Sequence, residues 1–271
     1  MTVPIHDIAK DVLQTLNRWK VPVDPFELAK MEGIELAPGD YGVGFDARIE
    51  FVPSVQRFFI YYSEAGLGRT EGRVHFSLAH ELGHFYIPKH RDKLLKGDLH
   101  CSQSDFRSRE PREIEADEFA ANLLMPKELF VKEVRRFRQR VCTLAEICRM
   151  ANERFRTSIT STARRYCQCD LEACSIVVSS NGIVRWALHS EDMRARNMKY
   201  IESGKGVPRD SMTATLVKTL RSSSDAEPVE GSVDSDIWFE RPYYKGMLWE
   251  EAMALGATGL VLTYITLEDA D

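Results

Sequence analysis

The stretch Ser77-Leu78-Ala79-His80-Glu81-Leu82-Gly83-His84-Phe85 carries two histidines four residues apart, with a glutamate directly after the first. Apolar residues at helical spacing on both sides of the histidines predict a helix that Pro88 ends. At about 3.6 residues per turn, His80 and His84 project from one face, so their imidazoles can meet one cation between them. Glu81 points to one side of that line but stays within reach of a water molecule on the cation. The stretch therefore predicts a metal site with a general base beside it.

A catalytic zinc site needs a third protein ligand and an open position for water. The helix predicted from Pro111 to Pro126 offers four acidic side chains, which are Glu113, Glu115, Asp117 and Glu118. Glu113 shares its face with small and apolar residues that suit close packing, whereas the face of Glu115 is typical of solvated helix surface. Glu113 is therefore the expected third ligand. Asp117 lies one turn further along the same face, and we expect it to accept the N–H of one of the two histidines, without the sequence deciding which.

Gly83 stands between the two histidines, and its missing side chain leaves room for another backbone to approach the helix. Two neutral imidazoles and one carboxylate leave a divalent cation with a net charge of about +1, which favours activation of water and of a carbonyl group. Zn²⁺ is the expected ion. Mn²⁺ is an alternative, because the same set of ligands accepts both metals.

The composition is typical of an ordinary globular protein, with 44% hydrophobic and 28% charged residues and a net charge of −5 over 271 residues. The first residues lack a basic region followed by an apolar core, and no apolar run approaches the roughly 20 residues that span a bilayer. We therefore expect a cytoplasmic protein without a membrane segment. Six reduced cysteines fit that compartment. Cys167, Cys169 and Cys174 could also hold a metal or sense oxidants, but ordinary buried thiols fit their spacing better.

Charge is distributed unevenly along the chain. Segment 131–166 is predicted to be helical and carries a net charge of +7, so the remaining residues carry −12. Helices and short strands precede this segment, with an irregular region predicted at 89–109. After Cys174 strands dominate, and Asn181-Gly182 predicts a hairpin turn. The pattern predicts an α+β protein in three parts, at 1–130, 131–170 and 171–271.

The first stretch, together with Glu113-Ile114-Glu115-Ala116-Asp117-Glu118-Phe119-Ala120-Ala121-Asn122-Leu123-Leu124-Met125-Pro126, resembles the ImmA/IrrE metallopeptidases over roughly residues 4 to 170. The resemblance implies a zincin-like domain of helices on a small curved sheet, a helix-turn-helix-like module and a GAF-like sensory C-terminal domain. It also implies a zinc-dependent endopeptidase whose ligands and base are His80, His84, Glu113 and Glu81. The implied substrate is a helix-turn-helix (XRE-like) transcriptional repressor, whose cleavage derepresses stress-response or mobile-element genes.

The basic segment 131–166 also resembles a helix-turn-helix, in which four arginines would contact DNA phosphates: Arg154, Arg156, Arg164 and Arg165. The alternative, which we favour, is that this segment packs on the peptidase domain and shapes a groove for a partly acidic substrate. Two rival functions follow. One is a DNA-binding transcriptional regulator with a structural metal site, and the other is a ligand-sensing module whose C-terminal domain gates the protease.

The sequence also offers candidates for the group that stabilises the oxyanion and for the strand that binds the substrate backbone. The group that stabilises the oxyanion is expected among histidines and tyrosines near the motif, which are His75, His90, His100, Tyr61, Tyr62 and Tyr86. The aromatic strand predicted at 58–62 is expected to be core on one face and to offer its edge to an extended substrate backbone.

Overall fold

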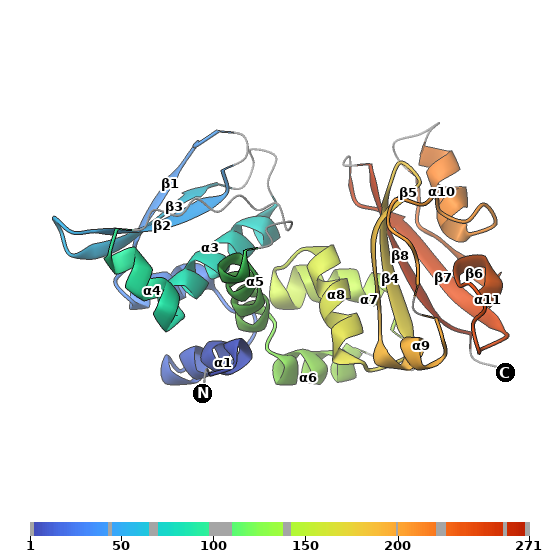
Figure 1. Cartoon of the computed structure of the whole chain (residues 1–271), viewed down its shortest axis with the longest axis horizontal. Helices are drawn as coiled ribbons and strands as arrows, with labels where there is room; N and C mark the ends of the chain where they lie inside the picture. Colours follow the sequence, from blue (N-terminus) through green and yellow to red (C-terminus); the bar gives the residue numbers. More distant parts are fainter. Residues whose placement is uncertain are drawn as a thin grey trace. The chain divides into compact units, whose positions relative to one another are not determined.

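A computed structural model describes residues 3–42, 45–64, 70–97, 110–137, 142–198, 200–220, 226–256 and 259–268. The structure is of the predicted mixed α+β class (Figure 1). It comprises two compact units. The first lies within Met1–Phe137 and Arg149–Ile159, and the second lies within Arg138–Cys148 and Thr160–Asp271.

The first unit packs helices on a small sheet. Its elements in chain order are α1 (Ile5–Thr15), α2 (Pro25–Met31), β1 (Glu35–Gly39), β2 (Ala47–Val52), β3 (Arg57–Ser63), α3 (Glu71–Tyr86), α4 (Pro88–Leu95), α5 (Pro111–Leu124), α6 (Lys127–Phe137) and the π-helix η1 (Met150–Phe155). The sheet has the order β1-β3-β2, with β1 parallel and β2 antiparallel to β3. Helix α3 contacts both β2 and β3 and also packs on α5 (Figure 1). Because it is covered on two sides, α3 is buried along most of its length.

Capping residues and prolines set several helix boundaries in this unit. The Asp24 carboxylate accepts the backbone N–H of Phe26 at 2.9 Å, and Pro25 occupies the first position of α2. The prediction of an irregular region at 89–109 is wrong for its first part, because Pro88 ends α3 and also opens α4. Helix α4 is strongly polar and buries only His90 and Leu94, so its apolar pattern was too sparse to indicate a helix. Residues 98–109 lie outside the described residues.

The prediction that the aromatic strand offers a free edge is also wrong. Strand β3 is the central strand of its sheet and pairs with β1 on one side and β2 on the other. Its backbone groups are therefore used within the sheet. The edge strand next to α3 is β2, which pairs with β3 from Ala47 to Val52.

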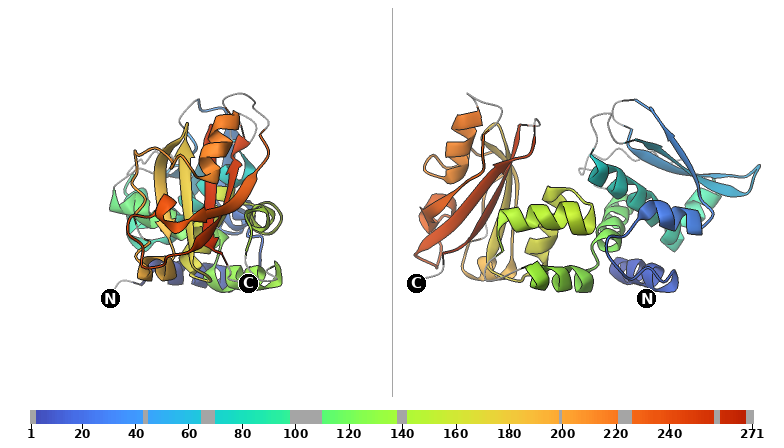
Figure 2. Two further views of the ribbon diagram at one scale, coloured as in Figure 1. Left: turned by 90° about the vertical axis from the view of Figure 1, so that its right-hand side faces the viewer. Right: turned by 180° about the vertical axis from the view of Figure 1, so that it is seen from behind.

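The second unit is built on an antiparallel sheet. Its elements are α7 (Leu144–Arg149), α8 (Ile159–Cys169, mostly in this unit), β4 (Cys174–Ser180), β5 (Ile183–His189), α9 (Glu191–Ala195), α10 (Met212–Leu220), β6 (Val229–Asp234), α11 (Ser235–Trp238), β7 (Met247–Ala254) and β8 (Leu260–Leu267). The five strands have the order β5-β4-β8-β7-β6. Helix α10 packs on β6 and β7, and Figure 2 shows it lying along the sheet.

Turn chemistry and alternating apolar residues account for this sheet. Asn181 and Gly182 adopt φ values of 52° and 77° between β4 and β5, so the predicted hairpin is confirmed. Strands β7 and β8 also pair antiparallel as a hairpin. The hydrophobic core on this sheet contains Val177, Leu248 and Ile265, each fully buried. Strand β6 and helix α10 were not predicted, because neither has a long apolar repeat.

The basic helical segment divides between the two units. Helices α6 and η1 belong to the first unit, where the rings of Phe130 and Phe155 stack with centroids 5.0 Å apart. Helix α7 belongs to the second unit, where the backbone N–H of Leu144 donates to the Glu251 carboxylate of β7 at 2.9 Å. Among the described helices, none combines the length and hydrophobicity needed to cross a bilayer.

Glu251 is a buried carboxylate whose environment opposes ionisation. Burial raises its pKa to about 7, although the N–H of Leu144 acts in the opposite direction. The folded state therefore holds its proton more tightly than the unfolded chain does. As pH rises from the unfolded pKa of 4.5 to about 7, the unfolded state loses this proton first, and the stability contributed by the neutral group is lost.

We predict that Glu251→Gln changes the pH dependence of stability. At pH 5 the variant and the parent should have similar free energies of unfolding. At pH 8 the variant should be more stable by about 1 to 2 kcal/mol, because glutamine accepts the same hydrogen bond without a buried charge. Denaturant unfolding at both pH values measures the difference, with the exposed Glu227→Gln as control. An equal effect of Glu251→Gln at both pH values would contradict the prediction.

Candidate metal centre

Three side chains from two helices converge in the first unit. His80 and His84 of α3 and Glu113 of α5 each direct a ligand atom toward one point, and all three side chains are buried. The two Nε2 atoms lie 3.1 Å apart. His80 Nε2 is 3.3 Å from Oε2 of Glu113, and His84 Nε2 is 3.4 Å from its Oε1. Among the described residues this is the one group of histidine, cysteine and acidic side chains arranged to hold a metal ion.

These distances fit a tetrahedral zinc ion. With zinc–ligand bonds of about 2.0 to 2.1 Å, neighbouring ligand atoms of a tetrahedron lie about 3.3 to 3.4 Å apart. The two Nε2 atoms lie 3.1 Å apart, and each lies 3.3 or 3.4 Å from a different oxygen of Glu113, so these separations are close to that edge length although they are not the edges of a single tetrahedron. Two imidazoles and a carboxylate are also the donor types of a catalytic rather than a fully closed structural site. The residues present therefore fit a zinc ion in the number and the type of their donor atoms.

Asp117 holds one of the two histidines. Its Oδ1 lies 2.8 Å from Nδ1 of His80. The sequence did not decide which of the two histidines Asp117 contacts, and the structure shows that it is His80. Burial disfavours the charged imidazolium of His80, but the hydrogen bonds with Asp117 and Glu113 outweigh burial and raise its pKa to about 10. Asp117 thus fixes the ring with Nε2 directed at the metal position.

His84 has a different environment. It is fully buried, and burial lowers its pKa. A neutral imidazole is the form that donates a lone pair to a metal. Glu113 lies between the two histidines, with Oε2 near His80 Nε2 and Oε1 near His84 Nε2.

Glu81 lies at the edge of this cluster with its two oxygens in different roles. Its side chain is 1% exposed, and Oε2 accepts the backbone N–H of Ile49 at 2.9 Å. Within the described residues, Oε1 has no hydrogen-bond partner. The strand thus holds one oxygen of the carboxylate and leaves the other available. Sequence reasoning could not find Ile49, because a backbone N–H carries no side-chain signal.

Gly83 explains how α5 comes close enough to supply Glu113. A Cβ built on Gly83 would lie 3.2 Å from Cα of Ala116 and 3.2 Å from the ring of Phe119. Contact at these distances leaves no space for a larger side chain. The predicted close approach of a second backbone is therefore present, and the backbone that approaches is that of α5.

Glu115 lies outside the centre but is less solvated than predicted. It accepts from Lys89 at 2.5 Å and pairs with His90 Nε2 at 2.9 Å. The His90 ring lies beside His84, with centroids 5.1 Å apart. Burial and the neighbouring His84 lower the pKa of His90 to about 4. Helix α4, which the sequence did not reveal, creates this pair.

Several candidates for oxyanion stabilisation already have other partners. Tyr86 donates its hydroxyl to Glu32 at 3.0 Å, and burial raises its pKa. His90 is held by Glu115, and His75 is buried with its ring edge-on to Phe26. His100 lies outside the described residues. The oxyanion donor therefore stays without an assignment.

The cysteines form no second metal centre in the described chain. None of the five described cysteines forms a disulfide, and Cys167, Cys169 and Cys174 are buried. A hydrogen bond with Cys167 and burial together raise the pKa of Cys174 well above its ordinary value. These thiols have the character of unreactive core residues.

Comparison with known proteins shows a similarity between this part of the chain and a known family. Residues 44–166 match the family model of a peptidase family described as the IrrE N-terminal-like domain. This segment is similar to that domain and covers less than half of the chain. The match includes all four of His80, Glu81, His84 and Glu113, and the family is one of metallopeptidases. It begins after β1, so it covers less than the roughly 4 to 170 expected from sequence resemblance.

A solved structure supports the fold over a longer range. A Mycobacterium tuberculosis transcriptional regulator matches with a TM-score of 0.57 and 12% sequence identity, over 97% of this chain and 77% of that chain. At this identity the likeness concerns the fold alone. A comparison with curated proteins found no significant match.

The arginines proposed to bind DNA differ in their environment. Within residues 44–166, Arg154 pairs with the buried Glu133 at 2.7 Å, and Arg165 is buried. Arg156 and Arg164 are exposed, although Arg156 lies 4.0 Å from Glu71. Two of the four side chains are therefore engaged in the structure and not presented as a basic surface.

We predict that Gly83→Val damages the first unit. The added side chain would meet the backbone of α5 and should lower the free energy of unfolding by about 1 to 3 kcal/mol. It should also weaken zinc binding, because Glu113 moves with α5. Thermal unfolding and metal analysis test both effects.

The control Glu118→Val places the same side chain on the exposed face of α5, where it should lower the free energy of unfolding by less than about 1 kcal/mol and leave the zinc content unchanged. Equal behaviour of the two variants would rule out the close-packing explanation.

Proposed function

We propose that this protein is a zinc-dependent endopeptidase that cleaves a helix-turn-helix transcriptional repressor. The observation that carries the proposal is the convergence of His80, His84 and Glu113 at the spacing of tetrahedral zinc ligands, with Glu81 beside them. The similarity to a peptidase family supports the peptidase reaction. Mn²⁺ is a second candidate for the metal, because the donor set suits both ions.

In this proposal His80, His84 and Glu113 would hold the metal, and a metal bound there would supply Lewis acidity to a water molecule and to the scissile carbonyl. Glu81 acts as general base. Its Oε1 accepts the proton of the attacking water and then delivers it to the leaving amine. Oε2 stays on the N–H of Ile49, so the carboxylate keeps one orientation during both transfers. Asp117 maintains the ring orientation of His80.

In this proposal the substrate backbone docks along the edge of β2. In the antiparallel pairing with β3, alternate residues of β2 direct their N–H and C=O groups away from the sheet, and the Ile49 N–H bound to Glu81 belongs to this outward set. An extended segment beside β2 would therefore pass next to the general base. Strand addition of this kind uses backbone hydrogen bonds for affinity and side-chain pockets for specificity.

The assignment to a repressor substrate rests on the family resemblance. IrrE-like enzymes act on repressors, and the helix-turn-helix-like segment 131–170 would serve as a docking module for such a protein. We further propose that the sheet domain at 171–271 is a GAF-like sensory domain. The structural neighbour's description as a transcriptional regulator is compatible with a role in gene control.

That description also favours one alternative, which is a DNA-binding regulator with a structural metal site. The engagement of Arg154 with Glu133 and the burial of Arg165 count against it. Salt-dependent binding to duplex DNA, without proteolysis of any repressor, would support this alternative over the peptidase.

We predict that Glu81→Gln retains the metal but lowers the cleavage rate by about 10²- to 10⁴-fold, because the amide accepts no proton from water. The assay is cleavage of the repressor encoded by the neighbouring gene, with and without chelator. Metal analysis of the same preparation shows whether the centre is intact. Glu118→Gln, at an exposed position of α5, is the control and should cleave normally. A fully active Glu81→Gln would remove Glu81 from the mechanism.

We predict that Glu113→Ala abolishes stoichiometric zinc binding. Asp117→Asn, which alters only a group that orients His80, should weaken zinc affinity by about 10- to 100-fold. Glu113→Ala should exceed that loss, because it removes a ligand atom. Competition with a zinc chelator measures all variants, and Glu115→Ala is the control because Glu115 contacts Lys89 and His90 rather than a ligand. Retention of parental zinc affinity by Glu113→Ala would exclude Glu113 as the third ligand.

A further inference from the structure

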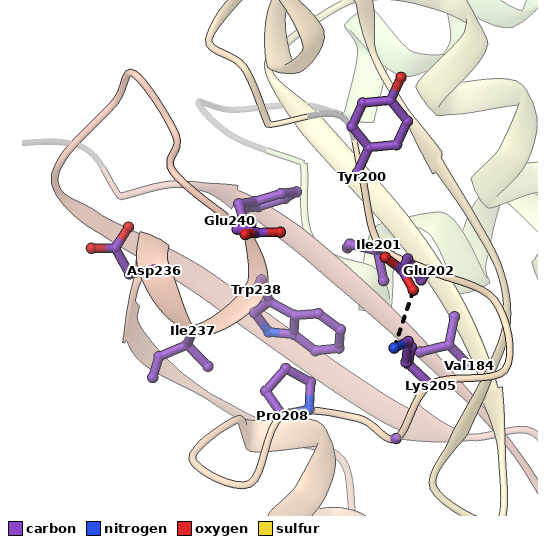
Figure 3. A pocket seen from close by; sticks show the side chains of 12 residues that line it. Val184, Tyr200, Ile201, Glu202, Lys205, Pro208, Asp236, Ile237, Trp238 and Glu240 are labelled. Atoms are coloured by element: carbon purple, nitrogen blue, oxygen red, sulfur yellow. Dashed lines mark ion pairs between the residues drawn. The ribbon is translucent and has the colours of Figure 1, made fainter.

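The second unit has a hollow of about 340 Å³, which Figure 3 shows from close by. Its aromatic wall residues Trp238 and Phe239 are almost fully buried, so they offer little ring surface to a ligand. At its rim Lys205 lies 3.4 Å from Glu202, and Figure 3 marks this ion pair. Because the charges are largely paired and the rings are covered, we assign no ligand to this hollow.

Arg91 of α4 is a cation held on an aromatic surface in the first unit. Its Cζ atom lies 4.3 Å from the ring centroid of Phe85 and 5.6 Å from that of Phe58. The two rings pack edge to face with centroids 5.0 Å apart, and both are nearly buried. Contact with these rings restricts the guanidinium group, so it has less conformational freedom to lose when it binds an anion.

No carboxylate in the described part of the chain neutralises Arg91. The side chain is exposed and forms no ion pair or side-chain hydrogen bond with a described residue. The carboxylates of the neighbouring strand are engaged elsewhere. Asp46, directly before β2, pairs with Arg73 at 2.9 Å, and Glu50 of β2 pairs with Arg48 at 3.1 Å. The positive charge of Arg91 is therefore available to an acidic group from outside the protein.

This charge lies one helix turn from the proposed general base. Glu81 and Phe85 are four residues apart on α3, so they share a face and lie about 6 Å apart along the helix axis. That face packs on the sheet, because Glu81 accepts the N–H of Ile49 and Phe85 contacts Phe58. Helix α4, which carries Arg91, contacts both α3 and β2 (Figure 1). The guanidinium group thus lies beyond Glu81 on the side of α3 that faces β2.

The register of β2 places Arg91 beside a defined position of a docked strand. Ile49 and Phe51 are two residues apart on β2, and Phe51 pairs with Phe58. Residues two apart in a strand share the direction of their backbone groups and the face of their side chains. A substrate segment paired with β2 would place one residue beside Ile49 and Glu81. The residue two positions away would lie at Phe51, on the side of Arg91.

We propose that Arg91 determines specificity by pairing with an acidic side chain of the substrate, two residues from the residue that lies beside Glu81. This role rests on the peptidase function proposed above and names a feature of its substrate. A guanidinium group matches a carboxylate in charge and geometry, so it favours an acidic residue over a neutral one and disfavours lysine. Because Arg91 lies one helix turn from the base, it selects the substrate without taking part in the proton transfers.

The first test uses the bond that the parent protein cleaves in the repressor encoded by the neighbouring gene. Mass spectrometry of the products identifies this bond, and we expect an acidic residue about two residues from it on one side. A synthetic peptide that spans the bond is prepared with this acid retained, replaced by glutamine or replaced by lysine. The parent should cleave the acidic peptide with a kcat/KM about tenfold above that of the lysine peptide, with the glutamine peptide between them. A cleaved bond without a nearby acidic residue, or equal kcat/KM for the three peptides, would overturn the proposal.

Charge reversal at Arg91 is the reciprocal test. Arg91→Glu should prefer the lysine peptide to the acidic peptide, whereas Arg91→Lys should keep the parental order. Lys93→Glu is the matched control, because it reverses an exposed charge on another face of α4 and should leave the order unchanged. The ratio of kcat/KM for two peptides does not depend on the folded fraction of a preparation, so a loss of stability cannot imitate the effect.

The outcomes separate this role from the peptidase function itself. A parental preference that Arg91→Glu leaves unchanged would refute the role of Arg91 while the peptidase function stands. A metal-loaded parent that cleaves neither the repressor nor any of the three peptides would overturn both.

Discussion

The close contact between α3 and α5 is the constraint on which the metal centre depends. The two histidines lie on α3, but the carboxylate that completes the ligand set lies on α5, about thirty residues further along the chain. An acidic side chain reaches the histidine nitrogens only if the two helix backbones nearly touch. Gly83 permits this contact, because α5 occupies the place where a side chain would stand. The sheet on the other side of α3 keeps the helix from moving away.

The first unit tolerates buried ionisable side chains at the candidate metal centre because hydrogen-bond donors or opposite charges lie beside them. Isolated charges inside a protein cost several kcal/mol, and they are retained where hydrogen bonds and opposite charges compensate them. His80 lies between Asp117 and Glu113, and Glu81 is held by a backbone N–H of β2. This compensation also fixes geometry. The same contacts that make burial acceptable aim Nε2 of His80 at the metal position and leave one oxygen of Glu81 available.

The second unit uses buried carboxylates for a different purpose. Glu250 accepts hydrogen bonds from the start of α10 and from Trp238, so one side chain caps a helix and anchors an indole ring. Glu251, its neighbour on β7, faces the other side of the sheet and accepts the N–H of Leu144. Adjacent residues of one strand thereby tie helices to both faces of the sheet.

The sequence by itself determined the α+β class and the two helices that carry His80, His84 and Glu113, the proposed ligands, because helical spacing decides which side chains share a face. It also indicated the hairpin at Asn181-Gly182, where two consecutive positive φ values favour those residue types. It did not reveal α4, whose polar sequence buries only His90 and Leu94. Only the tertiary structure decided that β3 is a central strand, that Asp117 holds His80 rather than His84, and that the N–H of Ile49 orients Glu81. These are contacts between segments that are distant in the chain, and several of them involve backbone atoms. Because backbone atoms are the same in every residue, the residue types in the sequence do not indicate such contacts.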